Sequence, residues 1–369
     1  MPFNDILSRY KDFDAEAYCA SVTGRQVERA LSKGRLDEHD YLALLSPAAS
    51  DYIERMALRA RDITRAHFGN TILLFTPLYV SNICDNFCPY CSFAHQNKIT
   101  RRHLTIDEVK KEAEHIAATG MRHILMLTGE SRKGAPVQYI RDCVAVMKDF
   151  FSSIAIEVYP LDKDEYAELV ECGADGLTVY QETYNRDIYA DLHKGGPKEN
   201  FDYRLSAPER ACLAGIRSVT VGALLGLAPP LMEAFFSGLH ARYLRDAFPS
   251  LEISASFPRL RPQVGKFETD YAIDDRTLVQ YMTAFRIFMP NAGITVSTRE
   301  PASLRDSILP MGPTKMSAGV NTAVGAATGG ASEPQFEIAD DRPVDKMQKD
   351  LLTRGFQPVM VDWNFILCR

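Results

Sequence analysis

Three of the eight cysteines lie within one short segment, NICDNFCPYCSF, at positions Cys84, Cys88 and Cys91. Thiolates separated by three and then two residues fold into a tight loop, so their sulfurs can converge on one metal centre. Three protein thiolates leave one iron of a cubane cluster without a protein ligand, and an open iron can bind a reactant. The spacing therefore predicts one 4Fe-4S cluster with an open coordination position.

Two other interpretations of these cysteines stay open from the residues alone. A structural zinc site would use His95 as its fourth ligand, since three cysteines and one histidine complete a tetrahedron. Zinc-binding pairs usually have a second pair well downstream, however. The other possibility is buried structural cysteines, because free cysteine packs as a small hydrophobic residue. A buried structural role suits isolated cysteines better than three cysteines in one polar loop. The isolated cysteines are Cys19, Cys143, Cys172, Cys212 and Cys368.

The composition is that of a soluble globular protein, with 369 residues of which 46% are hydrophobic and 24% are charged. The first residues, MPFNDILSRYKDFDAEAY, include acidic side chains and no continuous apolar stretch, so we expect neither a signal peptide nor a transit peptide. No apolar segment approaches the length of a membrane span. We expect a cytoplasmic protein, because a reducing compartment keeps thiolates available. The net charge of −6 argues against nucleic acid as a partner.

Two kinds of pattern divide the chain. Residues 1–70 carry apolar positions three and four apart, as in DYLALLSPAASDYIERMALRARDITRAHF, which predicts an N-terminal helical extension that caps the rest. In residues 71–320, short apolar runs alternate with amphipathic segments, which predicts strands alternating with helices. Residues 321–369 contain one further helix and one extended segment. We expect this C-terminal extension to pack on the preceding domain.

The alternating region contains eight predicted strands: TILLFTPLYV, HILMLTGE, IAIEVYP, DGLTVYQE, SVTVGALLG, LEISASFP, GITVSTRE and, more weakly, TKMSAG. This repetition over about 250 residues predicts an α/β fold, a (β/α)8 barrel of TIM type. An open doubly wound sheet is the alternative, because alternation alone does not say whether the sheet closes. The barrel is favoured by the residues that end or follow the strands, where barrel active sites are built. These are Cys84, Thr128, Gly129, Glu130, Glu157, Gln181, Glu182, Arg259, Arg299, Glu300 and Ser317.

The cysteine segment, with Tyr90 just before its last cysteine, resembles the signature of radical S-adenosylmethionine (SAM) enzymes. Further segments along essentially the whole chain resemble the 2-iminoacetate synthase family, the tyrosine lyases of thiamine biosynthesis within the aromatic amino acid lyase group. These segments are ALLSPAAS, FGNT, PLYVSNICDNFCPYCSF, LTGES, YQETYN, SASFPRLRP, STRE and DDRP. A related tyrosine lyase of hydrogenase cofactor maturation carries additional C-terminal cysteines for a second cluster. Here Cys368 stands alone near the end, so we expect one cluster.

The resemblance implies that the three cysteines bind a 4Fe-4S cluster whose open iron chelates SAM, and that one electron then cleaves SAM to methionine and a 5'-deoxyadenosyl radical. It also implies a set of polar contacts to SAM. These are Thr128, Gly129 and Glu130 for the methionyl amino group, Gln181 and Glu182 for the ribose, and Arg204 for the carboxylate, with Tyr90 and Glu157 beside them. From the residues alone these roles stay open, because strand ends are often merely polar and surface arginines are common.

A free amino acid substrate needs a match for its carboxylate, and the planar fork of an arginine supplies two donors. Arg299 in STRE is the predicted carboxylate ligand, with Ser317 as a second donor. Tyr79 precedes the cysteine loop on the first strand, and its hydroxyl is expected near the substrate amine. A tyrosine that only fills the barrel is the alternative at that position.

The family resemblance implies that tyrosine loses a hydrogen from its amine and that its Cα–Cβ bond then breaks. The products would be p-cresol and 2-iminoacetate (dehydroglycine), which feeds thiazole formation. The expected partners are the substrate L-tyrosine, a thiazole synthase that receives the unstable product, and a flavodoxin or ferredoxin that supplies the electron. Two alternatives are a radical SAM lyase that acts on tryptophan, and a zinc-stabilised partner of thiazole synthase without catalytic activity.

Overall fold

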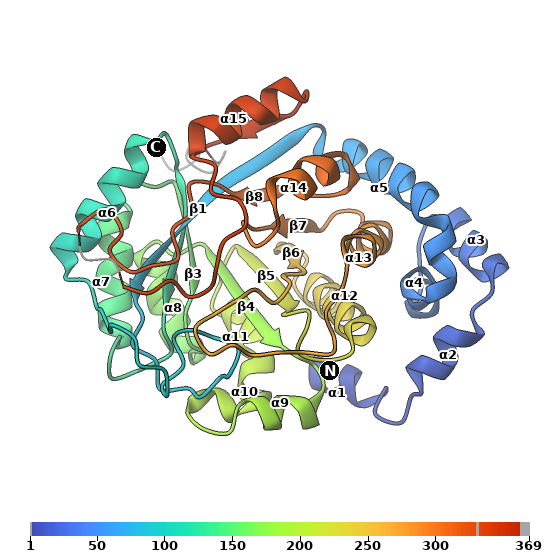
Figure 1. The fold of residues 1–369 in the computed structure, drawn as a ribbon, viewed down its shortest axis with the longest axis horizontal. Helices are drawn as coiled ribbons and strands as arrows, with labels where there is room; N and C mark the ends of the chain where they lie inside the picture. The colour runs from blue at the N-terminus through green and yellow to red at the C-terminus, as the bar shows by residue number, and fades with distance from the viewer. Residues whose placement is uncertain (1, 330–331, 362–369) are drawn as a thin grey trace.

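Parallel strands close into a barrel with helices on its outer side in the computed structural model, which describes residues 2–329 and 332–361 (Figure 1). The barrel strands are β1 (Thr71–Ser81), β2 (His123–Thr128), β3 (Ser153–Glu157), β4 (Gly176–Glu182), β5 (Ser218–Ala223), β6 (Glu252–Ser256), β7 (Gly293–Val296) and β8 (Lys315–Ser317). Each strand pairs with the next in chain order, as successive strand–helix–strand units require.

The outer layer is formed by helices that follow the strands: α6 (Ile106–Ala118), α7 (Val137–Met147), α8 (Lys163–Cys172), α11 (Ala207–Leu213), α12 (Pro230–Ala247), α13 (Asp275–Phe288) and α14 (Ala302–Ile308). The sequence predicts where α6 begins, because Thr105 and Glu108 form a capping box. The backbone N–H of Thr105 donates to Glu108 Oε2 at 2.8 Å, and the N–H of Glu108 donates to Thr105 Oγ1 at 3.3 Å.

Strand β1 closes the barrel. It pairs in parallel with β2 through Thr76–Ser81 and with β8 through Leu73–Phe75. A further short strand, β9 (Gln357–Val359), pairs with Thr71–Leu73 on the edge of β1 opposite β8. The C-terminal segment, which also contains α15 (Val344–Thr353), therefore extends the sheet along the part of β1 that lies before its pairing with β2.

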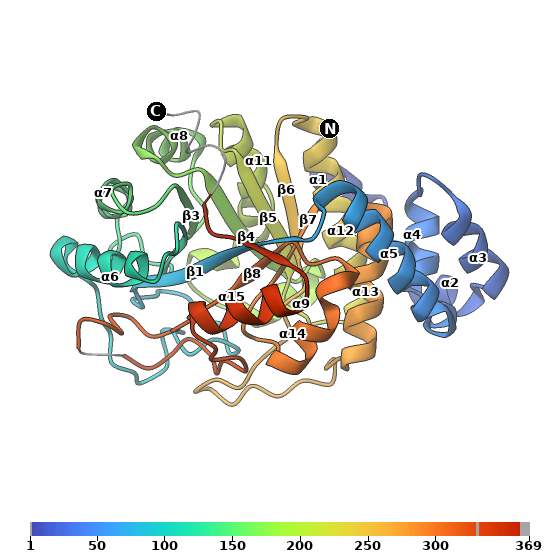
Figure 2. The same cartoon turned by 90° about the horizontal axis from the view of Figure 1, so that it is seen from above.

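An additional helical layer precedes the barrel and lies outside α12 and α13 (Figure 2). It comprises α1 (Phe3–Ser8), α2 (Ala15–Ser21), α3 (Gly24–Ser32), α4 (Glu38–Leu45), η1 (Pro47–Tyr52) and α5 (Ile53–Phe68). Tyr41 anchors this layer, since its ring stacks on Phe288 at 4.2 Å and its hydroxyl donates to the Ala234 carbonyl at 3.0 Å. Gly238 of α12 permits the contact, because a Cβ there would lie 2.4 Å from the Tyr41 ring.

Alternate residues of the strands face the barrel interior, as the two-residue period of a strand requires. On β1 these are Phe75, Pro77 and Tyr79, and on β4 they include Tyr180 and Glu182. The interior of the barrel is therefore lined at its carboxyl end by reactive side chains rather than by aliphatic residues alone.

These elements confirm the predicted (β/α)8 barrel, and its closure excludes the open doubly wound sheet. All eight predicted strands are present, and the weakly predicted TKMSAG contains β8, with three residues. The predicted C-terminal helix and extended segment correspond to α15 and β9. The division of the chain at residues 70 and 320 into an extension, a barrel and a C-terminal extension remains our proposal. No helix in the described part of the chain is both long and apolar enough to cross a membrane.

Candidate active site

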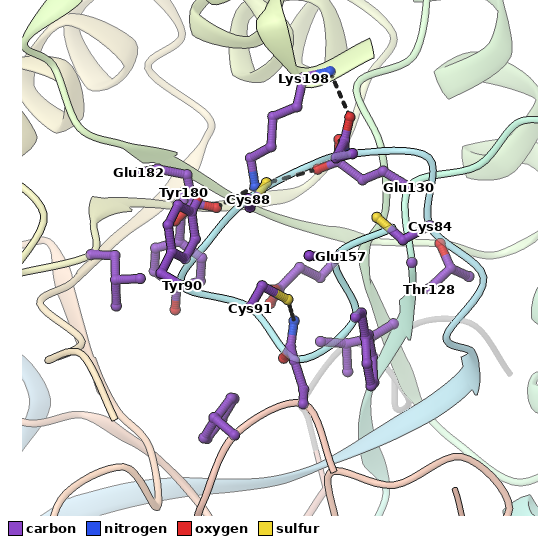
Figure 3. Close-up of a pocket in the computed structure, with 18 of the residues that line it drawn as sticks. Cys84, Cys88, Tyr90, Cys91, Thr128, Glu130, Glu157, Tyr180, Glu182 and Lys198 are labelled. Atoms are coloured by element: carbon purple, nitrogen blue, oxygen red, sulfur yellow. Dashed lines mark hydrogen bonds and ion pairs between the residues drawn. The ribbon is translucent and has the colours of Figure 1, made fainter. Parts of the chain in front are cut away.

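The cysteine loop leaves the barrel where β1 ends. Its far end returns to the sheet, where His103 forms an antiparallel bridge with Ser81. Cys84, Cys88 and Cys91 all line one cavity at the carboxyl end of the barrel (Figure 3). The structure therefore brings together the three thiols that the spacing predicts as metal ligands.

Contacts to the backbone of this loop, among them side-chain hydrogen bonds to its carbonyls, hold its conformation. The guanidinium of Arg101 donates to the carbonyls of Asn82 at 2.9 Å, Phe93 at 2.6 Å and Ala94 at 2.7 Å. Gly129, at the end of β2, also contacts the loop, since a Cβ at this position would lie 2.3 Å from the Ile83 carbonyl oxygen. Gly129 therefore has a structural reason to be glycine in addition to its predicted place near SAM.

Three thiols that line one cavity are the donor set of an iron–sulfur cluster, whose irons are held by cysteine thiolates. Burial raises the pKa of Cys84 and of Cys91 to about 11 and that of Cys88 to about 12. As free thiols these groups would stay protonated at neutral pH, so they become thiolates when a metal centre displaces the protons. Cys368, whose isolation near the end of the sequence led us to expect only one cluster, lies outside the described residues.

The single-ion zinc site has no support from the geometry. Within the described residues, no group of three His, Cys, Asp or Glu side chains is arranged to hold one common metal ion. His95 is exposed, and its Nδ1 lies 3.4 Å from the backbone carbonyl of Cys84 rather than in the cavity. Three thiols that face one cavity without a fourth ligand suit a cluster with an open iron better than a closed zinc tetrahedron.

Two carboxylates and two cations meet beside Cys88. Glu130 follows β2 and Glu182 ends β4, whereas Lys198 of η2 (Pro197–Glu199) and Arg204 of α10 (Phe201–Leu205) come from the segment after α9 (Arg186–Leu192). Arg204 Nη1 lies 2.7 Å from Glu130 Oε1, and Lys198 Nζ lies 2.7 Å from Glu182 Oε1. The cross distances are 3.8 Å from Lys198 to Glu130 and 3.5 Å from Arg204 to Glu182.

These charges set the protonation of the cavity carboxylates. Burial alone would raise the pKa of Glu130, but Arg204 and Lys198 outweigh burial and hold the pKa at about 2. The same two cations outweigh burial at Glu182 and lower its pKa. Glu157 has the opposite balance, because burial and the nearby Glu182 raise its pKa to about 7. At neutral pH two of the three carboxylates are therefore anionic, and the third is close to its midpoint.

Glu182 has an unusual backbone. Its φ is 70°, in the left-handed region that residues other than glycine rarely adopt. The pairing register between β4 and β5 is also irregular between Tyr180 and Glu182. Such strain is found mainly at functional sites, where the surroundings hold the residue in place. Here the ion pairs with Lys198 and Arg204 supply that restraint.

Tyr90 is buried and its hydroxyl lies 2.7 Å from His193 Nε2. Burial and the charge of Lys198 lower the pKa of His193 to about 3, so its imidazole is neutral. Because Nδ1 of His193 lies 2.8 Å from the Tyr189 carbonyl, Nδ1 carries the proton and Nε2 accepts from Tyr90. The predicted cofactor-site residue Tyr90 therefore lines the cavity through its ring and not through a free hydroxyl.

A second chamber continues from the first into the barrel. Tyr79, Glu157 and Arg299 line both chambers, and Ser317 lines the inner one. Arg299 forms no ion pair with a described carboxylate, and its guanidinium lies 3.5 Å from the centre of the Phe336 ring. This arginine is therefore available for an anionic ligand.

The neighbouring arginine that the strand ends also indicated, Arg259, is occupied by acidic partners. Its guanidinium makes hydrogen bonds to Glu300 and an ion pair with Asp275 at 2.8 Å. Ser317 also has a structural partner, because its Oγ accepts a hydrogen bond from the Thr298 backbone N–H at 3.1 Å.

The structure does not bring Gln181 to the cavity. Thr178, Tyr180 and Glu182 of β4 line the outer chamber, so Gln181 belongs to the opposite face of the strand, where it is buried. Strand alternation could have corrected this prediction. The other predicted site residues line one or both chambers: Tyr79, Cys84, Cys88, Tyr90, Cys91, Thr128, Gly129, Glu130, Glu157, Glu182, Arg204, Arg299 and Ser317.

Sequence reasoning missed several residues of the site. Asn86 donates to Glu130 Oε2 at 2.8 Å, and Lys198 neutralises both acidic residues beside Cys88. Gln335 accepts from the Tyr79 hydroxyl at 2.8 Å and lies against Cys91. Asn86 could have been found by its place between two of the three clustered cysteines, whereas Lys198, in the short turn η2, and Gln335, in a loop, occur in segments with no distinctive pattern.

Two family models match the chain. The Radical SAM superfamily model matches residues 78–228, and the Biotin and Thiamin Synthesis associated domain model matches residues 256–357. The first runs from the last residues of β1 to the loop after β5 and so includes the cysteine loop, Lys198 and Arg204. The second covers the later barrel strands, with Arg299, Ser317 and Gln335.

The chain is also similar over its whole length to characterised proteins. The 2-iminoacetate synthase of Escherichia coli (strain K12) is 40% identical over 366 residues, which cover 98% of this chain and 97% of that protein. The 2-iminoacetate synthase of Salmonella typhimurium is 39% identical, with 94% and 93% covered. Among solved structures, the FeFe-hydrogenase maturase HydG from Carboxydothermus hydrogenoformans superposes with a TM-score of 0.86 at 31% identity, with 98% of this chain and 84% of that chain covered.

Proposed function

The chain belongs to the 2-iminoacetate synthase family of the radical SAM superfamily, and from this membership we propose that its substrate is L-tyrosine. The protein is a radical SAM lyase. The proposed reaction breaks the Cα–Cβ bond of tyrosine and yields p-cresol and 2-iminoacetate for thiazole formation in thiamine biosynthesis.

The observation that carries this proposal is the continuity of two differently lined chambers. The outer chamber has the three cysteines and the charged group around Glu130, and the inner chamber has Arg299, which forms no ion pair with an acidic side chain in the described part of the chain. An amino acid bound in the inner chamber would therefore lie next to whatever the cysteines hold. Catalysis by a short-lived radical needs this proximity, because the reacting atoms must be held in near-attack geometry.

We assign Cys84, Cys88 and Cys91 as the ligands of one 4Fe-4S cluster, with SAM at the open iron. Family membership implies the iron–sulfur cluster and SAM. When bound, these two groups together supply a carbon radical that abstracts a hydrogen atom from the substrate. The protein's own contribution is to position both reactants and to keep water away from them.

We assign the charged group beside Cys88 to the amino acid end of SAM. Glu130 is anionic and would accept from the SAM amino group, while Arg204 holds Glu130 and presents further donors to the SAM carboxylate. Glu182 would accept hydrogen bonds from the ribose hydroxyls. Glu157 accepts no hydrogen bond from a described residue, so its carboxyl group is free to contact the cofactor.

We assign the inner chamber to tyrosine. Arg299 would pair with the substrate carboxylate through its planar fork, with Ser317 beside it. Tyr79 donates its hydroxyl proton to Gln335, so its oxygen lone pairs remain available to accept from the substrate amine. This arrangement would hold the amine at the boundary between the two chambers, where Tyr79 lies.

The proposed partners follow from the chemistry of the reactants. A flavodoxin or ferredoxin would supply the electron, and the exposed Phe87 of the cysteine loop offers an apolar contact close to the ligand Cys88. A thiazole synthase would accept 2-iminoacetate, which hydrolyses readily in water. We propose a cytoplasmic location, because cluster assembly needs reduced thiols.

Anaerobic reconstitution tests the assignment. The protein is loaded with iron and sulfide and incubated with SAM, dithionite and either tyrosine, phenylalanine or tryptophan, and p-cresol, glyoxylate and indole products are measured. We expect p-cresol and glyoxylate, the hydrolysis product of 2-iminoacetate, in equal amounts from tyrosine. A site that hydrogen-bonds a phenol can discriminate against phenylalanine by roughly four to five orders of magnitude.

The alternatives predict different results in the same assay. Faster product formation from tryptophan than from tyrosine would overturn the tyrosine assignment and leave the cluster and the barrel intact. A colourless protein that binds zinc and forms no product from any aromatic amino acid would support the non-catalytic alternative.

A further inference from the structure

One amide connects the two chambers of the site. Gln335 Oε1 accepts a hydrogen bond from the Tyr79 hydroxyl at 2.8 Å, and Gln335 Nε2 donates to Cys91 Sγ at 3.8 Å. Since Oε1 is the acceptor for the tyrosine, Nε2 is the atom that faces the sulfur. A residue of the inner chamber is therefore linked to a cluster ligand through a single side chain.

The backbone around Gln335 is fixed from both sides. Its carbonyl accepts from the Ser92 N–H at 3.3 Å, next to Cys91, and its own N–H donates to the Thr322 carbonyl at 3.1 Å. Thr322 Oγ1 in turn donates to the Phe336 carbonyl at 3.1 Å. The amide is thus held against the cysteine loop by contacts that do not involve its side chain.

The next residue contacts the other substrate-binding side chain. The Phe336 ring lies against the guanidinium of Arg299, which we assign to the substrate carboxylate. The dipeptide Gln335–Phe336 therefore contacts Tyr79, Arg299 and Cys91, which come from β1, the loop after β7 and the cysteine loop.

The hydrogen bonds of this group run in one direction. Tyr79 donates to Gln335, and Gln335 donates to the Cys91 sulfur. A substrate amine that donates to the Tyr79 oxygen would extend the series at its open end. Hydrogen bonds in such a series polarise one another, so a new donor at one end strengthens the donor at the other.

We propose that Gln335 is a positioning residue that couples amino acid binding in the inner chamber to the reduction potential of the cluster held by Cys91. This inference rests on the proposed function, because it takes Cys91 as a cluster ligand and the inner chamber as the substrate site. An N–H donor to a cluster thiolate stabilises the reduced, more negative cluster and so raises its potential. Substrate binding would strengthen this donor, and the cluster would be easier to reduce when tyrosine is present.

The test measures the midpoint potential of the reconstituted cluster by a titration followed with electron paramagnetic resonance, without SAM and without turnover. We expect L-tyrosine to raise the potential of the unmodified protein. In Gln335→Leu the potential without tyrosine should be lower, and the shift caused by tyrosine should be lost. Gln335→Glu keeps an acceptor for Tyr79 but cannot donate to the sulfur, so it should also lower the potential and abolish the shift.

Two further variants make the result specific. Gln263→Leu is the matched control, because Gln263 Nε2 also donates to the cysteine loop, at 3.2 Å, but to the Pro89 carbonyl and not to a sulfur. Its tyrosine-induced shift should equal that of the unmodified protein. Tyr79→Phe should abolish the tyrosine-induced shift in potential. The double variant of Tyr79→Phe and Gln335→Leu should lose no more of this shift than either single variant, because both changes break the same series of hydrogen bonds from Tyr79 to Cys91.

The outcomes separate this inference from the proposed function. An unmodified protein without any substrate-induced shift, or a shift that persists in Gln335→Leu and in Gln335→Glu, would overturn the coupling. If Gln335→Leu fails to load iron, the titrations of Gln335→Glu and Tyr79→Phe decide the question. If tryptophan is the amino acid that reacts and that causes a Gln335-dependent shift, the coupling stands and the tyrosine assignment fails.

Discussion

Arg204 and Glu130 form an ion pair in which Nη1 and Oε1 are 2.7 Å apart, although Arg204 belongs to α10 and Glu130 to the segment that follows β2. Arg204 is held from a second side, because its Nε donates to the Tyr180 carbonyl at 2.7 Å. The pair therefore fixes a carboxylate in its charged form beside the cysteine loop. A ligand with both an amino and a carboxylate group would meet preformed partners of opposite charge there.

Replacing Cys88 with alanine should abolish the cluster. We expect Cys88→Ala to lose the broad visible absorbance and the iron of the reconstituted protein and to lose SAM cleavage, because no other described cysteine lines the cavity besides Cys84 and Cys91. Cys172→Ala and Cys212→Ala are the controls, since neither residue lines the cavity and both variants should load iron normally. Wild-type SAM cleavage by Cys88→Ala would remove the cluster assignment.

Removing Lys198 should destabilise the fold and weaken SAM binding. Lys198→Met leaves Glu182 with Arg204 alone, at 3.5 Å, and breaking a buried ion pair on one side costs about 3 to 5 kcal/mol. Chemical denaturation of the unloaded protein measures the change in the free energy of unfolding. Lys194→Met is the matched control, because that side chain is exposed and its ion pair with Asp191 is exposed too. Equal stability of the two variants would contradict the role of Lys198.

Changing Arg299 to lysine should separate substrate binding from SAM chemistry. Arg299→Lys keeps the charge but loses the planar fork, so tyrosine should bind more weakly by about 1.5 to 3 kcal/mol, roughly a 10- to 150-fold rise in Kd. SAM affinity and SAM cleavage without tyrosine should be unchanged, which serves as the internal control. Unchanged tyrosine affinity would move the carboxylate ligand to another cation of the inner chamber, Lys315.

The stability of the protein should depend on the protonation of Glu233, a buried residue of α12 outside both chambers. Burial raises its pKa to about 7, although it accepts hydrogen bonds from the Thr183 hydroxyl and the Tyr184 N–H at 2.7 and 2.9 Å. The folded state therefore retains a proton that the unfolded chain releases near its ordinary pKa. The stabilisation that this retained proton gives the folded state is fully present below the pKa of Glu233 in the unfolded chain. It is lost as the pH rises through the folded-state pKa of about 7.

The variant Glu233→Gln measures this contribution. We expect the free energy of unfolding of the unmodified protein to fall, relative to that of the variant, by up to about 3 kcal/mol between pH 4.5 and 8. Denaturant titrations at several pH values of the two proteins give the difference directly, and other titrating groups cancel in it. Parallel pH profiles of the two proteins would show that Glu233 titrates normally in the folded state.

Local sequence was sufficient for the strands and for the cysteines that we propose as cluster ligands. Hydrophobic runs and their flanking turns mark β1 to β7 and, more weakly, the three-residue β8, and the three cysteines lie within eight residues of one another. Short-range patterns of this kind are written into consecutive residues, so no tertiary information is needed to read them. The alternation of side chains along a strand also predicts which of them face the barrel interior. On β4 it selects Glu182 for the cavity instead of Gln181.

Contacts between segments that are distant in the chain could not be predicted from local sequence. Lys198 lies in η2, a single short turn between α9 and α10, and Gln335 lies 256 residues from its hydrogen-bond partner Tyr79. Neither has a pattern that sets it apart from other polar loop residues. Whether the sheet closes is decided by the pairing of β8 with β1, which joins the two ends of the barrel.

The sequence by itself therefore determined the barrel class, the family and the three cysteines that we propose as cluster ligands, because each is specified by residues close together or by the order of local motifs. Only the tertiary structure decided which charges lie together in the cavity, that Arg259 but not Arg299 pairs with an acidic side chain among the described residues, and that Gln335 joins Tyr79 to Cys91. The physical reason is that charge and hydrogen bonding act over a few ångströms in space, and the fold sets those distances independently of separation along the chain.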